Sequence, residues 1–283
     1  MESNTPEPTK DVAIVVTCKG RLDYLKDTLP KMCSQDTRDT FTYRVVLVDY
    51  GCPDGTFEYF HRNPLPNLRV IKVEDKTDYF NLSRARNCGV MLADANIINF
   101  SDADTLVEPL WLYNITKPIR YDRAHVVNPV DWYCSKYGLG GTMYAAGEAI
   151  YSEGERATDI SAINHIKDVL MSGKCAMAMT MTAFLAVRGY DELMEGWGWE
   201  DNDMYDRLNQ LYTFQETQGH PLILQMNHHE SLRTEHYKEK DKKVSHEKNL
   251  QITNNRWDDD SPNPSGIGVC EYRIYDCDEI HAT

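Results

Sequence analysis

A chain of 283 residues, 41% hydrophobic and 26% charged, can bury the core of one large α/β domain or of one domain with an appended lobe. Its 44 acidic side chains outnumber its 30 basic ones and leave a formal net charge of −14. This balance argues against broad binding to nucleic-acid phosphates, which needs clustered lysines and arginines. The most basic stretch, residues 233–248, is interleaved with acidic residues and is interpreted as a solvated helix face.

The first half of the chain alternates apolar runs with segments of helical periodicity. Continuous β-branched runs predict strands buried on both faces, and leucines at helical spacing predict helices. Strands are expected at 12–17, 44–49, 68–73 and 97–100, with helices between them at 22–32, 56–62 and 82–93. This alternation predicts an α/β fold with a mostly parallel central sheet flanked by helices. Three of the strands end at Thr17, Asp49 and Asp102, and ligands of such sheets bind beyond the carboxyl ends of the strands.

The pattern weakens in the second half. Residues 132–174 are expected to form loops around one helix at 160–171, and loops of this length are usually functional or mobile. An apolar run at 175–187 predicts another strand, followed by a helix at 204–211 and a last strand at 269–275.

The cysteines and the N-terminus bear on localisation. The eight cysteines show no CxxC pair or zinc-type spacing, and we interpret them as reduced thiols, which favours a reducing compartment. Residues 1–10 lack the apolar core of a signal peptide, and no apolar run reaches the ~18 residues that a membrane span needs. We therefore expect a soluble, cytoplasmic protein, or a piece from which a membrane anchor is missing.

Two aspartates follow the last strand of the first half. Asp102 and Asp104 stand two positions apart where this strand ends, so their carboxylates can converge on a hard divalent cation. Mg²⁺ or Mn²⁺ held in this DxD motif would neutralise charge on a leaving diphosphate. The alternative interpretation is a surface turn, because DxD alone is a common pattern.

A second acidic pair lies beside tryptophans. In GWGWEDND, Glu200 and Asp201 follow Trp197 and Trp199. Sugars stack their apolar faces on aromatic rings and bind carboxylates through their hydroxyls, and a carboxylate beside indoles can have the raised pKa that a general base needs. The alternative is a helix N-terminus, where acidic residues favour the dipole. Both interpretations can hold together.

Two further motifs offer ligands for a metal and for a diphosphate. The adjacent His228 and His229 follow an apolar run, and imidazole suits Mn²⁺ better than Mg²⁺. Arg84 and Arg86 stand at the start of a predicted helix, where backbone donors also favour anions. The alternative is a helix capped by Ser83 with exposed arginines. No GxSxG, Walker loop or GxGxxG pattern indicates a different chemistry.

In combination, these motifs resemble those of GT-A fold glycosyltransferases. VAIVVTCKGRLDYL, VVLVDYGCPDGT, NLSRARNCGV and INFSDAD are similar to the successive nucleotide-sugar-binding segments of the family-2 type. RGYDELMEGWGWEDNDMYDRL resembles the galactosyltransferase signature shared by β-1,4-galactosyltransferases, chondroitin-synthesising enzymes and polypeptide GalNAc-transferases. The resemblance covers residues 11–130 and 175–256. It departs from the family at Tyr50-Gly51, where a second aspartate and a serine are usual, and at Trp199, where glycine is frequent.

The resemblance implies a role for each matching residue. Asp201 would be the catalytic base, and Glu200 would hold acceptor or donor hydroxyls. Asp104 would be the most direct metal ligand, assisted by Asp102 and by His229, with His228 as a competitor. The residues expected to contact the nucleotide-sugar are Thr17, Arg21, Asp49, Arg84, Arg86, Asn87, Asp102, Trp197 and Trp199.

The resemblance also implies an organisation and an activity. A disordered N-terminus at 1–10 precedes one GT-A domain at 11–256, in which 11–130 binds the nucleotide-sugar and 131–256 the acceptor, and an extension follows at 257–283. The expected activity is metal-dependent, inverting transfer of a Gal- or GalNAc-type sugar from a UDP-sugar, with Mn²⁺ or Mg²⁺, to a hydroxyl acceptor, with a glycan favoured. The alternatives are a nucleotidyltransferase, a non-catalytic glycan-binding module, and sugar transfer to a nucleic-acid base.

Overall fold

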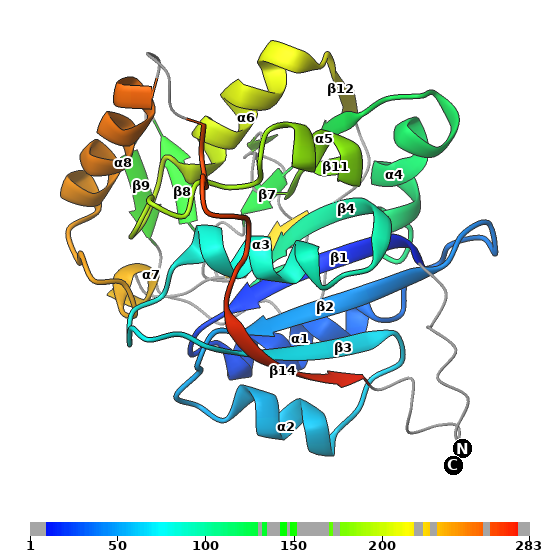
Figure 1. The fold of residues 1–283 in the computed structure, drawn as a ribbon. Coiled ribbons are helices and arrows are strands. Elements are labelled where there is room, and N and C mark those ends of the chain that lie inside the picture. Colours follow the sequence, from blue (N-terminus) through cyan, green and yellow to red (C-terminus); the bar gives the residue numbers. More distant parts are fainter. Residues whose placement is uncertain are drawn as a thin grey trace.

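The computed structural model describes residues 10–129, 132–134, 142–145, 148–151, 170–171, 176–217, 223–226, 231–256 and 261–276. Its centre is an eight-stranded sheet with helices on both faces (Figure 1). In spatial order the strands are β12 (Phe214–Thr217), β6 (Val126–Pro129), β11 (Ala178–Thr180), β4 (Ala95–Asp102), β1 (Lys10–Cys18), β2 (Tyr43–Asp49), β3 (Leu68–Glu74) and β14 (Glu271–Asp276). Strands β4, β1, β2 and β3 are parallel, whereas β11 and β14 run antiparallel to their neighbours. The predicted α/β class, with a central sheet flanked by helices, is confirmed.

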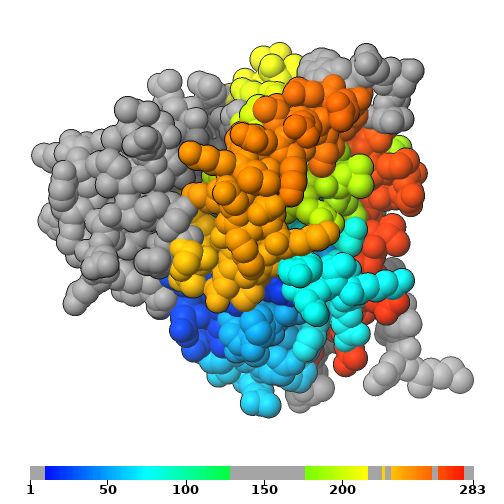
Figure 2. Space-filling model, turned by 90° about the vertical axis from the view of Figure 1, so that its left-hand side faces the viewer, coloured from blue at the N-terminus to red at the C-terminus, as the bar shows by residue number. Residues whose placement is uncertain are grey.

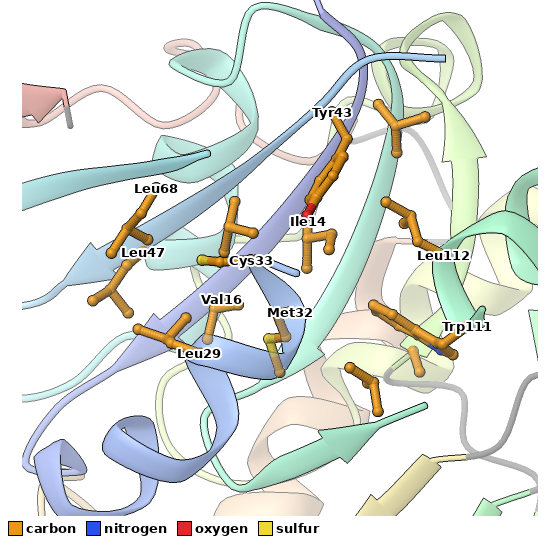
Figure 3. Close-up of a cluster of buried hydrophobic side chains, with 14 of the residues drawn as sticks. Ile14, Val16, Leu29, Met32, Cys33, Tyr43, Leu47, Leu68, Trp111 and Leu112 are labelled. Carbon is orange, nitrogen blue, oxygen red and sulfur yellow. The ribbon is translucent and has the colours of Figure 1, made fainter. Parts of the chain in front are cut away.

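The helices cover both faces because every second side chain of a strand points to the same side. They are α1 (Leu22–Met32), α2 (Thr56–Arg62), α3 (Leu82–Met91), α4 (Trp111–Tyr121), α5 (Met181–Ala186), α6 (Glu200–Leu211), α7 (Ser231–Thr234) and α8 (Lys242–Arg256). From β1, Val12, Ile14 and Val16 pack in a core with α1 and α4 (Figure 3), and Ala13 and Val15 pack in a second core with α3, α5 and α6. Among the described residues, no helix combines the length and apolar character that crossing a bilayer requires.

The other described strands form two smaller sheets. One has the order β10 (Leu170–Met171), β7 (Trp132–Cys134), β13 (Ile223–Gln225) and β5 (Thr105–Val107), and the other pairs β8 (Thr142–Ala145) with β9 (Glu148–Tyr151). The antiparallel pairing of β13 with β5 sets Gln225 opposite Thr105. The next residue, Met226, donates its N–H to the carbonyl oxygen of Asp104 at 2.7 Å. This contact joins the second half of the chain to the DxD motif.

β14 closes one edge of the central sheet. The segment that leads to it crosses α3 before it pairs antiparallel with β3 (Figure 1). Its last residue, Asp276, accepts a hydrogen bond from Arg69 Nε at 2.9 Å and lies 3.6 Å from Nη2 of the fully buried Arg44. The described part of the C-terminal extension therefore contributes a strand and a buried counter-charge to the first half.

Three predictions for the second half are wrong. β7, β8 and β9 are strands in a stretch expected to form loops. The apolar run at 175–187 is not one strand, because only its middle is β11 and the part that follows is α5. This helix begins at Thr180, whose hydroxyl accepts a hydrogen bond from the N–H of Ala183 at 3.1 Å. A short apolar run does not by itself distinguish a buried strand from a buried helix. Residues 170–171, expected to end a helix, form β10, and the rest of that predicted helix lies outside the described residues.

Candidate functional site

A cleft of about 460 Å³ lies at the carboxyl ends of β1 and β4. These strands contribute Thr17 and Asp102, and the turn before α6 contributes two tryptophans. Arg233 and Tyr237 line the cleft from the segment that includes α7 and leads to α8. Figure 2 shows this segment and α8 (orange) packed against the blue and cyan atoms of the N-terminal part. The cleft is therefore bounded by residues from both halves of the sequence.

The cleft brings together nine of the residues predicted for the site. They are Thr17, Arg21, Arg86, Asp102, Asp104, Trp197, Trp199, Glu200 and Asp201. Asp49, Arg84 and Asn87 do not line it. His228 and His229 lie outside the described residues, so their predicted role stays a prediction.

Asp49 organises the turn that follows β2. Its carboxylate accepts hydrogen bonds from the backbone N–H of Cys52 at 2.7 Å and of Phe57 at 2.8 Å. Burial raises the pKa of Asp49, although these hydrogen bonds oppose the shift. The carboxylate thus holds the backbone of residues 51–57, and its contact with a nucleotide base stays a prediction.

Arg84 and Asn87 join α3 to the segment before α6. Arg84 places Nη1 3.0 Å from Asp75 Oδ2 and Nε 3.0 Å from Glu192 Oε2. The buried Asn87 donates from Nδ2 to Glu192 Oε1 at 2.9 Å and to the carbonyl oxygen of Tyr190 at 2.8 Å. Both side chains fix the helix that carries Arg86.

α3 delivers Arg86 to the cleft because the helix is capped and packs closely on the sheet. Asn81 caps it by accepting the N–H of the residue three positions later at 2.9 Å, so Ser83 is not the cap. One turn after Arg86, a Cβ added at Gly89 would lie only 2.5 Å from Cγ1 of Val15. The absence of a side chain at Gly89 therefore allows the helix to lie against β1.

Arg86 is the common partner of both acidic motifs. Its side chain is 3% exposed, which excludes the alternative of a solvent-exposed arginine. Nη1 lies 2.7 Å from Asp201 Oδ1 and 3.7 Å from Glu200 Oε1, and Nη2 lies 3.4 Å from Asp102 Oδ1. Burial alone would lower the pKa of Arg86, but the nearby carboxylates, Asp201 foremost, raise it above its usual range. The guanidinium is therefore a permanent positive charge between the DxD motif and the acidic pair.

Two carboxyl groups of the cluster bind protons more tightly than usual. Burial, followed by the charge of Asp201, raises the pKa of Glu200 to about 8 despite Arg86. Burial and the charges of Asp104 and Asp201 raise the pKa of Asp102 to about 6, also against Arg86. Oε2 of Glu200 is buried and has no hydrogen-bond partner among the described residues. Near neutral pH, Glu200 is therefore mainly a neutral acid, which can act as a hydrogen-bond donor.

Glu200→Gln is expected to raise the stability of the chain increasingly with pH. The folded chain keeps a proton on Glu200 that the unfolded chain releases above a pKa of about 4.3, so the wild-type free energy of unfolding falls as pH rises towards the folded pKa. Glutamine removes this fall, and the advantage of the variant grows by at most about 1.4 kcal/mol per pH unit. Urea unfolding measures the advantage of the variant over the wild type, and this advantage should be about 2 kcal/mol larger at about pH 6.5 than at about pH 5. The exposed Glu247→Gln is the control, and equal differences at both pH values would contradict the buried, protonated state.

Three residues of the turn before α6 have a left-handed backbone conformation. Gly196 and Gly198 both have φ of 91°, and Trp199 has φ of 74°. α8 holds this turn, because Asn249 donates from Nδ2 to the carbonyl oxygen of Gly198 at 2.7 Å and Trp199 donates from Nε1 to Thr253 Oγ1 at 3.0 Å. The tryptophans and the acidic pair are therefore positioned by a helix some fifty residues further along the chain.

α6 begins at Glu200, four residues earlier than predicted. Glu200 and Asp201 thus lie in its first turn, where the helix dipole favours negative charge. The two interpretations of this acidic pair hold together, because the same residues start a helix and line the cleft.

Several cationic and aromatic lining residues are not among those predicted for the site from the sequence. They are Lys19, Phe80, Arg233, His236, Tyr237 and His246. Lys19 is held by a hydrogen bond from Nζ to the carbonyl oxygen of Tyr50 at 3.0 Å. Its place directly after the first strand is the one signal that could have indicated it. The others follow from tertiary contacts.

The DxD motif suits a hard divalent cation by its chemistry. Asp102 and Asp104 both line the cleft and offer carboxylate oxygens, the ligands that Mg²⁺ and Mn²⁺ take together with substrate phosphates. The described residues contain no group of three or more His, Cys, Asp or Glu side chains that could hold a metal by itself. Met226, whose backbone N–H donates a hydrogen bond to the carbonyl oxygen of Asp104, stands three positions before His229 in the sequence. A cation here would therefore need a further ligand from substrate or from outside the described residues.

Comparisons with known proteins give one family and one fold. A model of the family described as "Glycosyltransferase like family 2" matches residues 11–249. The hyaluronan synthase of Pasteurella multocida is 27% identical over 119 residues, which are 42% of this chain and 12% of that protein. S. aureus TarS 1–349 superposes with a TM-score of 0.54 at 15% identity, over 76% of this chain and 60% of that one. The complex of TarS 1–349 with UDP-GlcNAc gives a TM-score of 0.52 at 14% identity, over 76% and 58%.

Proposed function

The chain belongs to the family-2-like glycosyltransferases, and from this premise we propose that it transfers a sugar from a UDP-sugar to a hydroxyl group of an acceptor, with inversion at the anomeric carbon. One observation carries the proposal. The DxD motif and the acidic pair line the same cleft and share the buried guanidinium of Arg86. A donor site and a base are thus combined at the carboxyl ends of the parallel strands, where ligands of such sheets bind.

The donor is a nucleotide-sugar with a UDP moiety. The structures of TarS in complex with UDP-GlcNAc and with UDP support this choice, since TarS shares the fold. The cleft offers cations for a diphosphate, with Lys19, Arg21 and Arg233 among its lining residues. A Gal- or GalNAc-type sugar, as the GWGWED motif implies, and the GlcNAc of the TarS complex are the first donors to compare.

Asp201 would act as the base. Its Oδ1 is held by Arg86, and the carboxylate lines the cleft. It takes the proton of the acceptor hydroxyl while the acceptor oxygen forms a bond to the anomeric carbon. The bond from that carbon to the diphosphate breaks on the opposite side, and UDP leaves with the electron pair, which gives inversion. Glu200, neutral near pH 7, would bind a sugar hydroxyl as donor or acceptor.

A divalent cation would be held by Asp104 and Asp102, with His229 as the further predicted ligand. When bound, it supplies charge stabilisation to the departing diphosphate. Lys19, Arg21 and Arg233 line the same cleft and would add positive charge, and Trp197 offers an aromatic surface for a sugar. Nζ of Lys242 lies 4.6 Å from the centre of the Trp197 ring, which keeps a cation beside this surface.

The activity is tested by release of UDP from a panel of UDP-sugars with Mn²⁺, with and without glycan acceptors. We expect acceptor-dependent release of UDP from one donor of the panel. A non-catalytic glycan-binding module would release none from any donor. Release without acceptor would indicate slow donor hydrolysis and still identify the sugar.

Asp104→Asn is expected to remove most of the effect of Mn²⁺ on UDP binding. In the wild type, Asp104 would hold the cation, which would supply positive charge to the diphosphate, so we expect Mn²⁺ to tighten UDP binding by about tenfold or more. Isothermal titration of UDP with and without Mn²⁺ measures this ratio for both proteins. Asp122→Asn, an exposed aspartate after α4, is the matched control. A full Mn²⁺ effect in a variant that lacks both Asp104 and His229 would contradict the metal site.

A further inference from the structure

A buried tyrosine contacts the proposed base, Asp201. The side chain of Tyr190 is fully buried, and its hydroxyl donates to Oδ1 of Asp201 at 3.2 Å. Burial raises the pKa of Tyr190, although Arg86 opposes the shift, so the phenol keeps its proton. Asp201 is the one hydrogen-bond partner of this hydroxyl among the described residues.

Both the backbone and the ring of Tyr190 are held by neighbouring residues. Its backbone N–H donates to Oδ1 of Asn87 at 2.9 Å, and its carbonyl oxygen accepts from Nδ2 of Asn87 at 2.8 Å and of Asn263 at 2.6 Å. The ring meets Phe100 edge-on at 5.2 Å, and the guanidinium of Arg86 lies 4.8 Å from its centre. The hydroxyl therefore has a defined position relative to α3 and β4.

The two donors to Asp201 bind the same oxygen. Arg86 Nη1 and Tyr190 Oη both reach Oδ1, while Oδ2 has no hydrogen-bond partner among the described residues. Arg86 is also shared with Asp102 and Glu200, so its bond to Asp201 does not by itself fix the carboxylate. Tyr190 is the donor that serves Asp201 alone.

From this geometry we infer that Tyr190 is a positioning residue for the proposed transfer, which holds Oδ1 of Asp201 so that Oδ2 receives the proton of the acceptor hydroxyl. The inference rests on the proposed function, because it concerns the orientation of the base. Base catalysis depends on such orientation, and a small misplacement of the base lowers the rate of the chemical step without changing donor binding. Asn87 holds the backbone of this tyrosine through two hydrogen bonds, and its predicted contact with the nucleotide-sugar stays a prediction.

Tyr190→Phe tests the inference because it keeps the ring and removes only the hydroxyl. We expect kcat for transfer to fall by about 10–100-fold, with the KM for the donor and the affinity for UDP unchanged. Tyr43→Phe is the matched control. It removes another buried hydroxyl, which accepts from the N–H of Gln35 at 2.9 Å in the core under α1, and should leave kcat unchanged.

The outcomes separate this inference from the proposed function. An unchanged kcat in Tyr190→Phe, with transfer lost in Asp201→Asn, would overturn the positioning role and leave the base in place. Loss of UDP affinity in step with kcat, or a stability loss that accounts for the lost activity, would show a structural role and also overturn it. A double-mutant cycle completes the test, since Tyr190→Phe should have no further effect on the residual activity of Asp201→Asn.

Discussion

Asp201→Asn is expected to lower the rate of sugar transfer by about 10³-fold while UDP still binds. The amide keeps the shape of the side chain and can still accept a hydrogen bond from Arg86, but it cannot take a proton from the acceptor hydroxyl. General bases contribute about 10²–10⁴-fold to enzymatic rates, so kcat should fall by about 10³-fold. Acceptor-dependent release of UDP measures the loss, and isothermal titration measures UDP binding in the same preparation.

The control for this variant lies on the same helix. Asp206 is exposed on α6, outside the residues that line the cleft, so Asp206→Asn should keep wild-type activity. Full transfer activity in Asp201→Asn would show that another group is the base. Loss of UDP binding together with activity would show that Asp201 serves the donor site rather than the chemical step.

Arg86→Met is expected to destabilise the chain by about 3–5 kcal/mol, because it leaves Asp102 and Asp201 without their buried counter-charge. The cost depends on pH in a defined direction. Arg86 opposes the rise in the pKa of Asp102 and of Glu200, so without it both pKa values rise further and the folded variant holds protons that the unfolded chain has released. Its free energy of unfolding therefore falls as pH rises, and the difference from wild type should be larger at about pH 8 than at about pH 5.

Urea unfolding at both pH values measures this effect, and Arg120→Met is the control. Arg120 lies on α4 and contacts rings and neutral oxygens, including those of Thr116 and Tyr113, with no carboxylate partner among the described residues. Its replacement should change stability by a similar amount at both pH values. A destabilisation by Arg86→Met that does not vary with pH would mean that packing of its side chain, rather than charge, dominates.

The first half of the fold follows from local sequence. Apolar runs such as 12–17 and 44–49 are buried on both faces, which leaves only parallel strands between helices as their arrangement. The run at 175–187 was ambiguous because its periodicity fits a buried strand or helix, and Thr180 decides the outcome by capping a helix inside it. Strands β7, β8 and β9 lie in a stretch expected to form loops. They could not be predicted because each is only three or four residues long. So short a strand leaves little alternation to detect.

In the candidate site, too, some residues can be predicted from local sequence and others only from the fold. Asp102, Asp104, Glu200 and Asp201 stand in short motifs whose chemistry can be read from residue type and spacing. The burial of Arg86 could not be predicted, since its partners are up to 115 residues away in sequence. Tyr190 stands in the same signature as Asp201, RGYDELMEGWGWEDND, but the motif does not indicate that its hydroxyl contacts the proposed base. Motifs thus identify the acidic groups, and the fold determines which of them share the guanidinium of Arg86 as a counter-ion.

The pairing of β14 with β3 has a consequence for the order in which the chain can fold during synthesis. β3 leaves the ribosome about 200 residues before its partner, and domains fold largely as they emerge. Throughout that interval β3 presents an open edge, the kind of edge on which chains associate wrongly, and Arg44 and Arg69 lack the carboxylate of Asp276. The sheet of the first half is therefore encoded first but completed last, and a ribosome that stops before residue 271 releases a sheet with one edge unprotected.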